Sequence, residues 1–144
     1  MTVLVDTSAW YALADASDSN HKKAKTYYEQ SIEESQFILT DAILVETWSL
    51  INARKGWNAA YEFFRKIRES AFDIHYLGEL DYENAWRILN DYSELELSLV
   101  DCTTLSYMDR SRIQHIFTFD KHFLIYRYGP HKQFALVCHP HVPQ

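Results

Sequence analysis

The stretch Val3-Leu4-Val5-Asp6-Thr7-Ser8, close to the beginning of the chain, decides the fold. Its three consecutive apolar residues include two β-branched ones, which predicts a short, fully buried strand. The strand ends on the carboxylate of Asp6, and two hydroxyl residues and a helical pattern follow. Ligands of open α/β sheets bind outside the carboxyl ends of the strands. We therefore expect Asp6 to stand at the functional edge of a sheet.

The remaining chain alternates between strand and helix patterns. Further strands are predicted at residues 36–39, 72–76, 116–119 and 135–138, and the alternation of apolar and polar residues over 72–76 suits a strand near an edge. Helices are expected over 21–35, over 42 to about 54, from 57 onward, from 81 onward and from 101 to about 112. This order predicts a three-layer α/β/α domain with a mainly parallel central sheet.

Local signals suggest where several helices begin. Asp41 is expected to cap the helix that begins at Ala42, and Asp81 to cap a later one. At 100° per residue, Glu46 falls just outside the edge of the apolar face of its helix. This places a carboxylate at the border of the core.

The composition restricts the class of protein. A chain of 144 residues suits a single domain, which we expect to span residues 1–144. Hydrophobic residues make up 47% of the chain, and the whole chain contains only three glycines. This composition excludes a low-complexity sequence. With no long apolar run and no pattern typical of a signal peptide, we expect a cytoplasmic protein without a membrane span. The two cysteines, Cys102 and Cys138, lack zinc-ligand spacing and are expected to be reduced and buried.

The charge is distributed unevenly. The formal net charge is −6, which argues against a general nucleic-acid-coating protein. Residues 1–101 carry 9 Lys and Arg against 18 Asp and Glu, whereas residues 102–144 carry 5 against 2. The C-terminal third is therefore basic, and its charges are either a binding surface or simply solvated. The candidate phosphate contacts are Arg110, Arg112, Lys121, Arg127 and Lys132.

Four acidic residues lie where a site would form. Asp6 and Asp120 end predicted strands, Glu46 lies early in a helix that follows a strand, and Asp101 opens another helix. All four can meet at one end of the sheet. Neighbouring carboxylates cannot all stay ionised unless some bind a proton or a cation joins them. Mg²⁺ and similar hard ions take oxygen ligands, and such a site suits phosphoryl hydrolysis.

The motifs around these acids resemble those of the PIN domain family. They are Val-Asp-Thr-Ser-Ala-Trp at 5–10, Leu-Val-Glu-Thr at 44–47, Leu-Ser-Leu-Val-Asp-Cys at 97–102 and Phe-Thr-Phe-Asp-Lys-His-Phe at 117–123. The likeness covers nearly the whole chain in the right order. It implies a metal-dependent endoribonuclease in which Asp6, Glu46, Asp101 and Asp120 form a Mg²⁺ or Mn²⁺ site, with Ser8 and Thr118 supporting it.

The resemblance also implies partners. Single-domain members are often the toxin of a VapBC-type toxin–antitoxin pair, so it implies an RNA substrate, a small antitoxin protein and a homodimer. Two other interpretations stay open. The first is a non-catalytic module whose acids hold an ion or a basic partner segment, and the second is a housekeeping nuclease outside any toxin–antitoxin pair.

Overall fold

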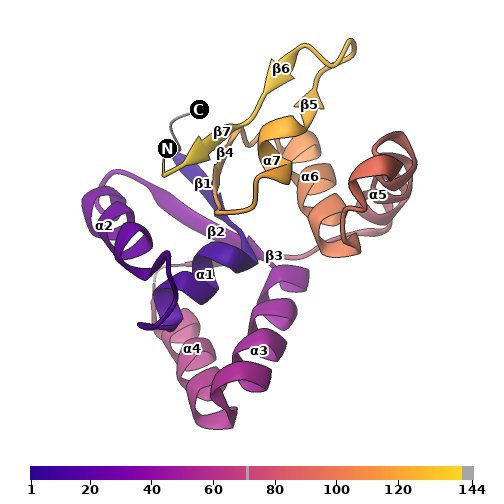
Figure 1. The fold of residues 1–144 in the computed structure, drawn as a ribbon. Helices are drawn as coiled ribbons and strands as arrows, with labels where there is room; N and C mark the ends of the chain where they lie inside the picture. The colour runs from indigo at the N-terminus through magenta and orange to yellow at the C-terminus, as the bar shows by residue number, and fades with distance from the viewer. Residues whose placement is uncertain (71, 141–144) are drawn as a thin grey trace.

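The computed structural model describes residues 1–70 and 72–140, and a parallel sheet lies at its centre (Figure 1). Its strands have the spatial order β3-β2-β1-β4-β7, and every neighbouring pair is parallel. Strand β1, with Val3 paired to both Phe37 and His115, is the central one. The strand bounds are β1 Thr2–Val5, β2 Gln36–Thr40, β3 Asp73–His75, β4 His115–Phe117 and β7 Val137–His139.

Helices flank this sheet, which is the predicted fold class. In Figure 1, α1 and α2 lie on one side of the strands, whereas α5 and α6 lie on the other. A short 3₁₀ turn, η1 (Ser93–Leu95), joins α5 to α6. The helix bounds are α1 Thr7–Ala14, α2 His21–Ser31, α3 Asp41–Lys55, α4 Trp57–Glu69, α5 Glu79–Asp91, α6 Leu99–Ser111 and α7 His122–Ile125.

The core is built on β1 and its two neighbours. Val3, Leu4 and Val5 are at most 1% exposed, so the strand is covered on both faces, as its unbroken apolar run predicts. Each fully buried side chain of this kind contributes about 2 kcal/mol through its removal from water. Because Asp6 follows directly, this buried strand holds its backbone rigidly.

The tryptophans divide between core and surface. Trp10 of α1 is 5% exposed and packs edge-on against the rings of Phe63 and Phe72. Trp57 of α4 and Trp86 of α5 are more than half exposed. Helical periodicity places all three on apolar helix faces, but of these only Trp10 is in the core of the chain.

Two predicted helix caps were wrong. Thr40 is the cap of α3, since its Oγ1 accepts the Ile43 amide at 3.2 Å, while Asp41 Oδ1 accepts the amide of Leu77 from a distant segment. Helix α5 begins after Gly78, and Asp81 is its third residue, with Oδ2 accepting the Gly78 amide. Which side chain caps a helix depends on the residue at which the helix begins, and local composition does not specify that residue.

The C-terminal segment differs from the single strand predicted at 135–138. The chain forms an antiparallel hairpin of β5 (Arg127–Tyr128) and β6 (Phe134–Ala135) before β7 joins the sheet. Gly129, with φ +95°, begins the connection, a conformation that favours glycine. Strands of two or three residues carry too few side chains to produce a readable alternation.

The cysteines agree with the sequence in part, because both were expected to be reduced and buried. Cys102 and Cys138 are both free thiols, the first buried and the second partly exposed. Among the helices of residues 1–70 and 72–140, none is long and apolar enough to cross a membrane.

Candidate active site

Asp6 lies at the junction of β1 and α1 and is 3% exposed. Its Oδ2 accepts hydrogen bonds from Ser8 Oγ and Thr118 Oγ1, both at 2.9 Å. Burial and the nearby charge of Asp101 nevertheless raise the pKa of Asp6 from 3.8 to about 6, although the two hydroxyls oppose this shift. The ionised form of this carboxyl group is unfavourable in its surroundings, and a cation bound in place of the proton would stabilise it.

The same two hydroxyls tie Asp6 to the end of β4. Ser8 Oγ accepts the amide of Phe119 at 2.9 Å, and Thr118 Oγ1 accepts the amide of Asp120 at 3.0 Å. Each hydroxyl therefore donates to the carboxylate and accepts from the loop that carries Asp120. This arrangement fits the supporting role that the sequence motifs implied for Ser8 and Thr118.

Asp101 lies in the first turn of α6 and is its third residue. Ser98 caps the helix, because its Oγ accepts the Asp101 amide at 3.0 Å and its own amide donates to Asp101 Oδ2 at 3.3 Å. This reciprocal capping box orients the carboxylate. Burial, then the charges of Asp120 and Glu46, raise the pKa of Asp101.

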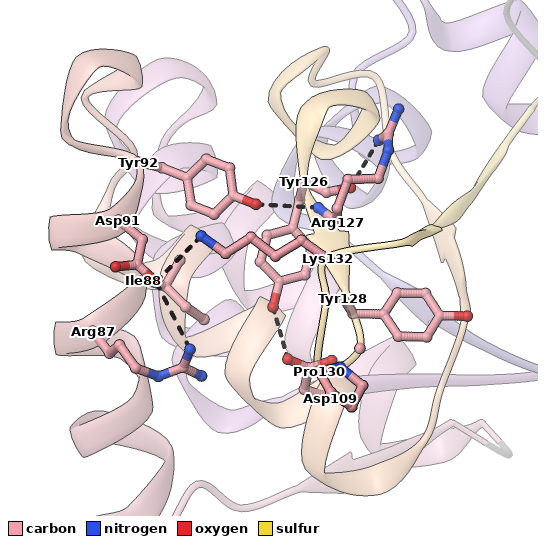
Figure 2. Close-up of a pocket in the computed structure, with 11 residues that line it drawn as sticks. Arg87, Ile88, Asp91, Tyr92, Asp109, Tyr126, Arg127, Tyr128, Pro130 and Lys132 are labelled. Carbon is pink, nitrogen blue, oxygen red and sulfur yellow. Dashed lines mark hydrogen bonds and ion pairs between the residues drawn. The ribbon is translucent and has the colours of Figure 1, made fainter.

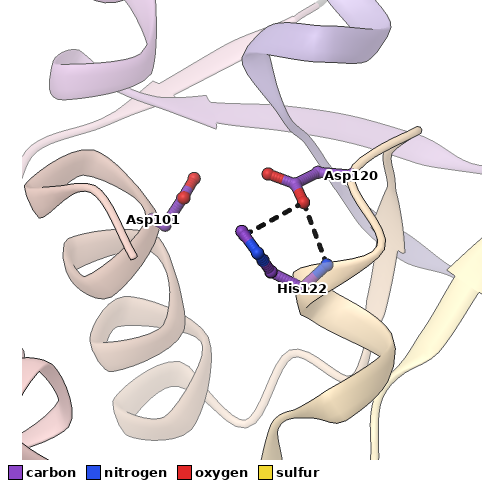
Figure 3. A group of neighbouring side chains, drawn as sticks. All are labelled: Asp101, Asp120 and His122. Carbon is purple, nitrogen blue, oxygen red and sulfur yellow. Dashed lines mark hydrogen bonds and ion pairs between the residues drawn. The ribbon is translucent and has the colours of Figure 1, made fainter. Parts of the chain in front are cut away.

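Asp120 follows β4 and faces Asp101 across a short gap, with His122 between them (Figure 3). Asp120 Oδ1 accepts the His122 amide at 2.9 Å and lies 3.4 Å from His122 Nδ1. One ligand atom from each of Asp101, Asp120 and His122 lies within 4.8 Å of the others, close enough to share one metal ion. His122 was not among the predicted ligands; its position two residues after Asp120 was the available signal.

Glu46 completes the set from the second turn of α3, where it is partly exposed. A cleft of about 420 Å³ brings all four predicted acids together. It is lined by Asp6, Thr7, Ser8, Tyr11, Asp18, Asn20, Glu46, Leu50, Arg54, Ser98, Asp101, Phe119 and Asp120. The donor set is rich in carboxylate oxygens, and two of the carboxyl groups have raised pKa values. This chemistry fits a hard divalent cation such as Mg²⁺ or Mn²⁺.

The predicted basic contacts have different surroundings. Arg110 makes a two-pronged ion pair with Asp81, at 2.7 and 2.9 Å, and its charge is therefore already engaged within the fold. Arg112 and Lys121 are exposed, and Lys121 directly follows Asp120. Neither residue is among those that line the acidic cleft.

Arg127 and Lys132 lie at a second pocket, formed by α5, α6 and the β5–β6 hairpin (Figure 2). Arg127 Nη1 donates to the carbonyl oxygens of residues 124–126 at the end of α7. Lys132 Nζ lies 3.7 Å from Asp91 and over the ring of Tyr92. These two cations are thus held by neighbouring groups of their own pocket.

This fold, together with the order of the acidic motifs around one cleft, identifies the class of protein. Residues 3–127 match the PIN domain family, and the chain belongs to that family. It is 33% identical to the 23S rRNA-specific endonuclease VapC20 of Mycobacterium tuberculosis over 122 aligned residues. The aligned region covers 84% of this chain and 91% of the relative. The ribonuclease VapC26 of the same species is 25% identical over 122 residues, covering 84% and 89% of the two chains.

Solved structures agree on the fold. The crystal structure of M. tuberculosis VapC20, described as a Sarcin-Ricin loop cleaving toxin, superposes with a TM-score of 0.77 at 30% identity and covers 83% of this chain and 90% of that one. VapBC2 from Rickettsia felis, bound to a DNA fragment from its promoter, gives a TM-score of 0.65 at 12% identity. That match covers 85% of this chain and 91% of the other, and at this identity it speaks for the fold alone.

Proposed function

We propose that the protein is a metal-dependent endoribonuclease that hydrolyses phosphodiester bonds in RNA. The observation that carries this proposal is the convergence of Asp6, Glu46, Asp101 and Asp120 on one cleft, with the pKa values of Asp6 and Asp101 raised. The names of the relatives VapC20 and VapC26, an endonuclease and a ribonuclease, support it.

We assign separate roles to the four acids. Asp6 and Asp101, the two acids with raised pKa values, would hold Mg²⁺ or Mn²⁺, and Asp120 and Glu46 would complete the site. A divalent ion bound there would acidify a water molecule and stabilise charge on the phosphate. The carboxylate of Asp120 or Glu46 would orient the attacking water and accept its proton.

Cleavage of a labelled RNA by the purified chain tests this function. We expect cleavage with Mg²⁺ or Mn²⁺ and none with a chelator. Asp6→Asn and Asp101→Asn should abolish cleavage while the fold is retained, whereas Glu33→Gln, an exposed acid on the turn after α2, should leave it unchanged. Equal cleavage by the Asp6 variant, or in the presence of chelator, would refute the proposal. Because VapC20 is named for 23S rRNA, that molecule is the first substrate to test.

We further propose that the chain is a VapBC-type toxin with a small antitoxin partner and that it acts as a homodimer in the cytoplasm. Support comes from the relatives with VapC names and from a similar fold in a toxin–antitoxin complex of Klebsiella pneumoniae. Expression of the chain alone should arrest growth, and co-expression of the product of a neighbouring small gene should relieve the arrest. Sedimentation equilibrium of the purified chain measures its oligomeric state.

A further inference from the structure

Helix α3 presents a row of three side chains to the acidic cleft. Glu46, Leu50 and Arg54 are spaced by four residues, so they lie on one face of the helix, and all three line the cleft. With a rise of 1.5 Å per residue, Arg54 lies about 12 Å beyond Glu46 along the helix axis. The row therefore begins with an acid at the proposed metal site and ends with a cation two turns away.

Arg54 is the one Lys or Arg among the described residues that line this cleft, against five carboxylates. A bound divalent ion would offset two of those negative charges, and the rest would still repel a polyanion such as RNA. A cation at the wall of the cleft reduces that repulsion where the strand would leave the metal site. The acidic balance of the N-terminal two thirds of the chain makes this cation more important.

The guanidinium of Arg54 lies over an aromatic ring. Its Cζ lies 5.0 Å from the centroid of the Tyr11 ring, and Tyr11 is itself buried at 6% exposure. The Arg54 side chain is exposed, so its N–H groups can reach a ligand in the cleft, and the planar guanidinium suits a two-pronged contact with phosphate.

A second layer of contacts fixes the Tyr11 ring. Its hydroxyl donates to Asp15 Oδ2 at 2.6 Å, and Asp15 Oδ1 accepts from both the amide and the hydroxyl of Ser17. These bonds hold the pKa of Asp15 well below its usual range, and Lys55 Nζ lies 3.5 Å away. Asp15 is therefore ionised at neutral pH and anchors Tyr11, which in turn supports Arg54.

We propose that Arg54 is a substrate-binding residue that contacts a backbone phosphate of single-stranded RNA next to the scissile one. The inference rests on the proposed ribonuclease function, because it takes the acids at the other end of the cleft as the site of cleavage. RNA is favoured over an acidic protein segment because a strand held at the acids must continue along the same cleft. Arg54 would bind substrate without taking part in bond breaking.

The test compares Arg54→Ala and Arg54→Lys with the wild type in two assays. Steady-state cleavage gives kcat and KM, and binding of a short oligoribonucleotide in chelator is measured over a range of salt concentrations. Arg54→Ala should raise KM about tenfold with kcat nearly unchanged, as expected for loss of one charged hydrogen-bonding contact. The slope of log affinity against log salt should fall by about 0.7, the value for one phosphate contact on a single strand.

Two further variants make the result specific. Arg54→Lys keeps the charge but loses the planar, two-pronged guanidinium, so it should retain the salt slope and recover part of the affinity. Lys23→Ala removes an exposed cation of α2 outside the cleft and should change neither quantity. Melting temperatures of all variants show whether a change reflects misfolding, which would lower kcat as well.

The possible failures are distinguishable. If the wild type cleaves no RNA with Mg²⁺ or Mn²⁺, the proposed function fails. If the wild type cleaves RNA but Arg54→Ala keeps its KM and salt slope, the role of Arg54 is overturned alone. If Arg54→Ala loses binding of a polyglutamate peptide while RNA binding is unchanged, Arg54 serves an acidic protein segment, which also overturns the proposal.

Discussion

Thr118 Oγ1 donates a 2.9 Å hydrogen bond to Asp6 Oδ2, although 112 positions separate the two residues in the chain. The same oxygen accepts the amide of Asp120 at 3.0 Å. One hydroxyl therefore stabilises the ionised form of a buried carboxylate and holds the backbone of a second acid in place.

Replacement of Thr118 by valine keeps the shape of the side chain but removes both hydrogen bonds. Asp6 then binds its proton more tightly and the Asp120 amide loses its partner, so metal affinity should fall. We expect the Mg²⁺ concentration for half-maximal cleavage to rise roughly tenfold or more, as for other groups that support metal ligands. Thr26→Val, at an exposed position of α2, is the matched control. An unchanged metal requirement in Thr118→Val would contradict this prediction.

Asp6 should lower the stability of the metal-free protein at neutral pH. Its folded pKa of about 6 lies above the unfolded value near 3.8, so the folded state binds the proton more tightly. Stability from this group is present below pH 4 and is lost as the pH rises through about 6. Asn cannot ionise. The free energy of unfolding of Asp6→Asn at pH 7.5 should therefore be higher than that of the wild type by on the order of 2–3 kcal/mol.

Urea unfolding in chelator measures this difference. At pH 4 the advantage of Asp6→Asn should be small, because Asp6 of the wild type is then protonated in the folded state. Mg²⁺ should stabilise the wild type at pH 7.5 and have little effect on the variant. A difference between the two proteins that does not vary with pH would rule out ionisation of Asp6 as the cause.

The ion pair of Arg110 and Asp81 should act on stability. Asp81 is fully buried, and its pKa is lowered chiefly by the hydrogen bonds from Arg110. Arg110→Ala would leave this carboxylate without its main partner and should cost about 3 kcal/mol, although the half-exposed guanidinium makes the pair less extreme than a fully buried one. Arg112→Ala, at an exposed position directly after α6, should reduce stability far less.

Calorimetric melting of both variants measures the loss of stability. Binding of an oligoribonucleotide tests whether Arg110 also contacts RNA. If Arg110 contacted RNA, its removal would reduce the salt dependence of binding at temperatures where the variant is folded. We expect no such reduction. An Arg110→Ala protein with a normal melting temperature and a reduced salt slope would restore the interpretation of Arg110 as a phosphate contact.

His122 should affect which metals bind. An imidazole nitrogen beside Asp101 and Asp120 suits Ni²⁺ or Zn²⁺, whereas Mg²⁺ takes oxygen ligands. His122→Ala should therefore weaken Ni²⁺ binding strongly and change Mg²⁺-supported cleavage little. Titration calorimetry with each metal measures both, with His131→Ala in the exposed hairpin connection as control. Equal losses for Ni²⁺ and Mg²⁺ would show that His122 acts on the site in another way.

Local sequence patterns revealed more about the strands than about the helix ends. The apolar run before Asp6 predicted the central buried strand, because burial on both faces requires apolar residues at consecutive positions. The caps at Asp41 and Asp81 were mispredicted, since each carboxylate bonds to a backbone amide that the tertiary fold or a neighbouring turn brings near. The β5–β6 hairpin was too short to leave a pattern.

What the sequence alone determined was the parallel α/β fold, the position of three acids at its strand and helix ends, and that of a fourth, Glu46, early in a helix. These follow from hydrophobic periodicity and from the order of motifs, both of which are properties of the chain itself. Only the tertiary structure decided which side chains act together: His122 with Asp101 and Asp120, Arg110 with Asp81, and Arg54 with Tyr11. Contacts between distant segments depend on how helices pack and turn, and no local pattern encodes that geometry.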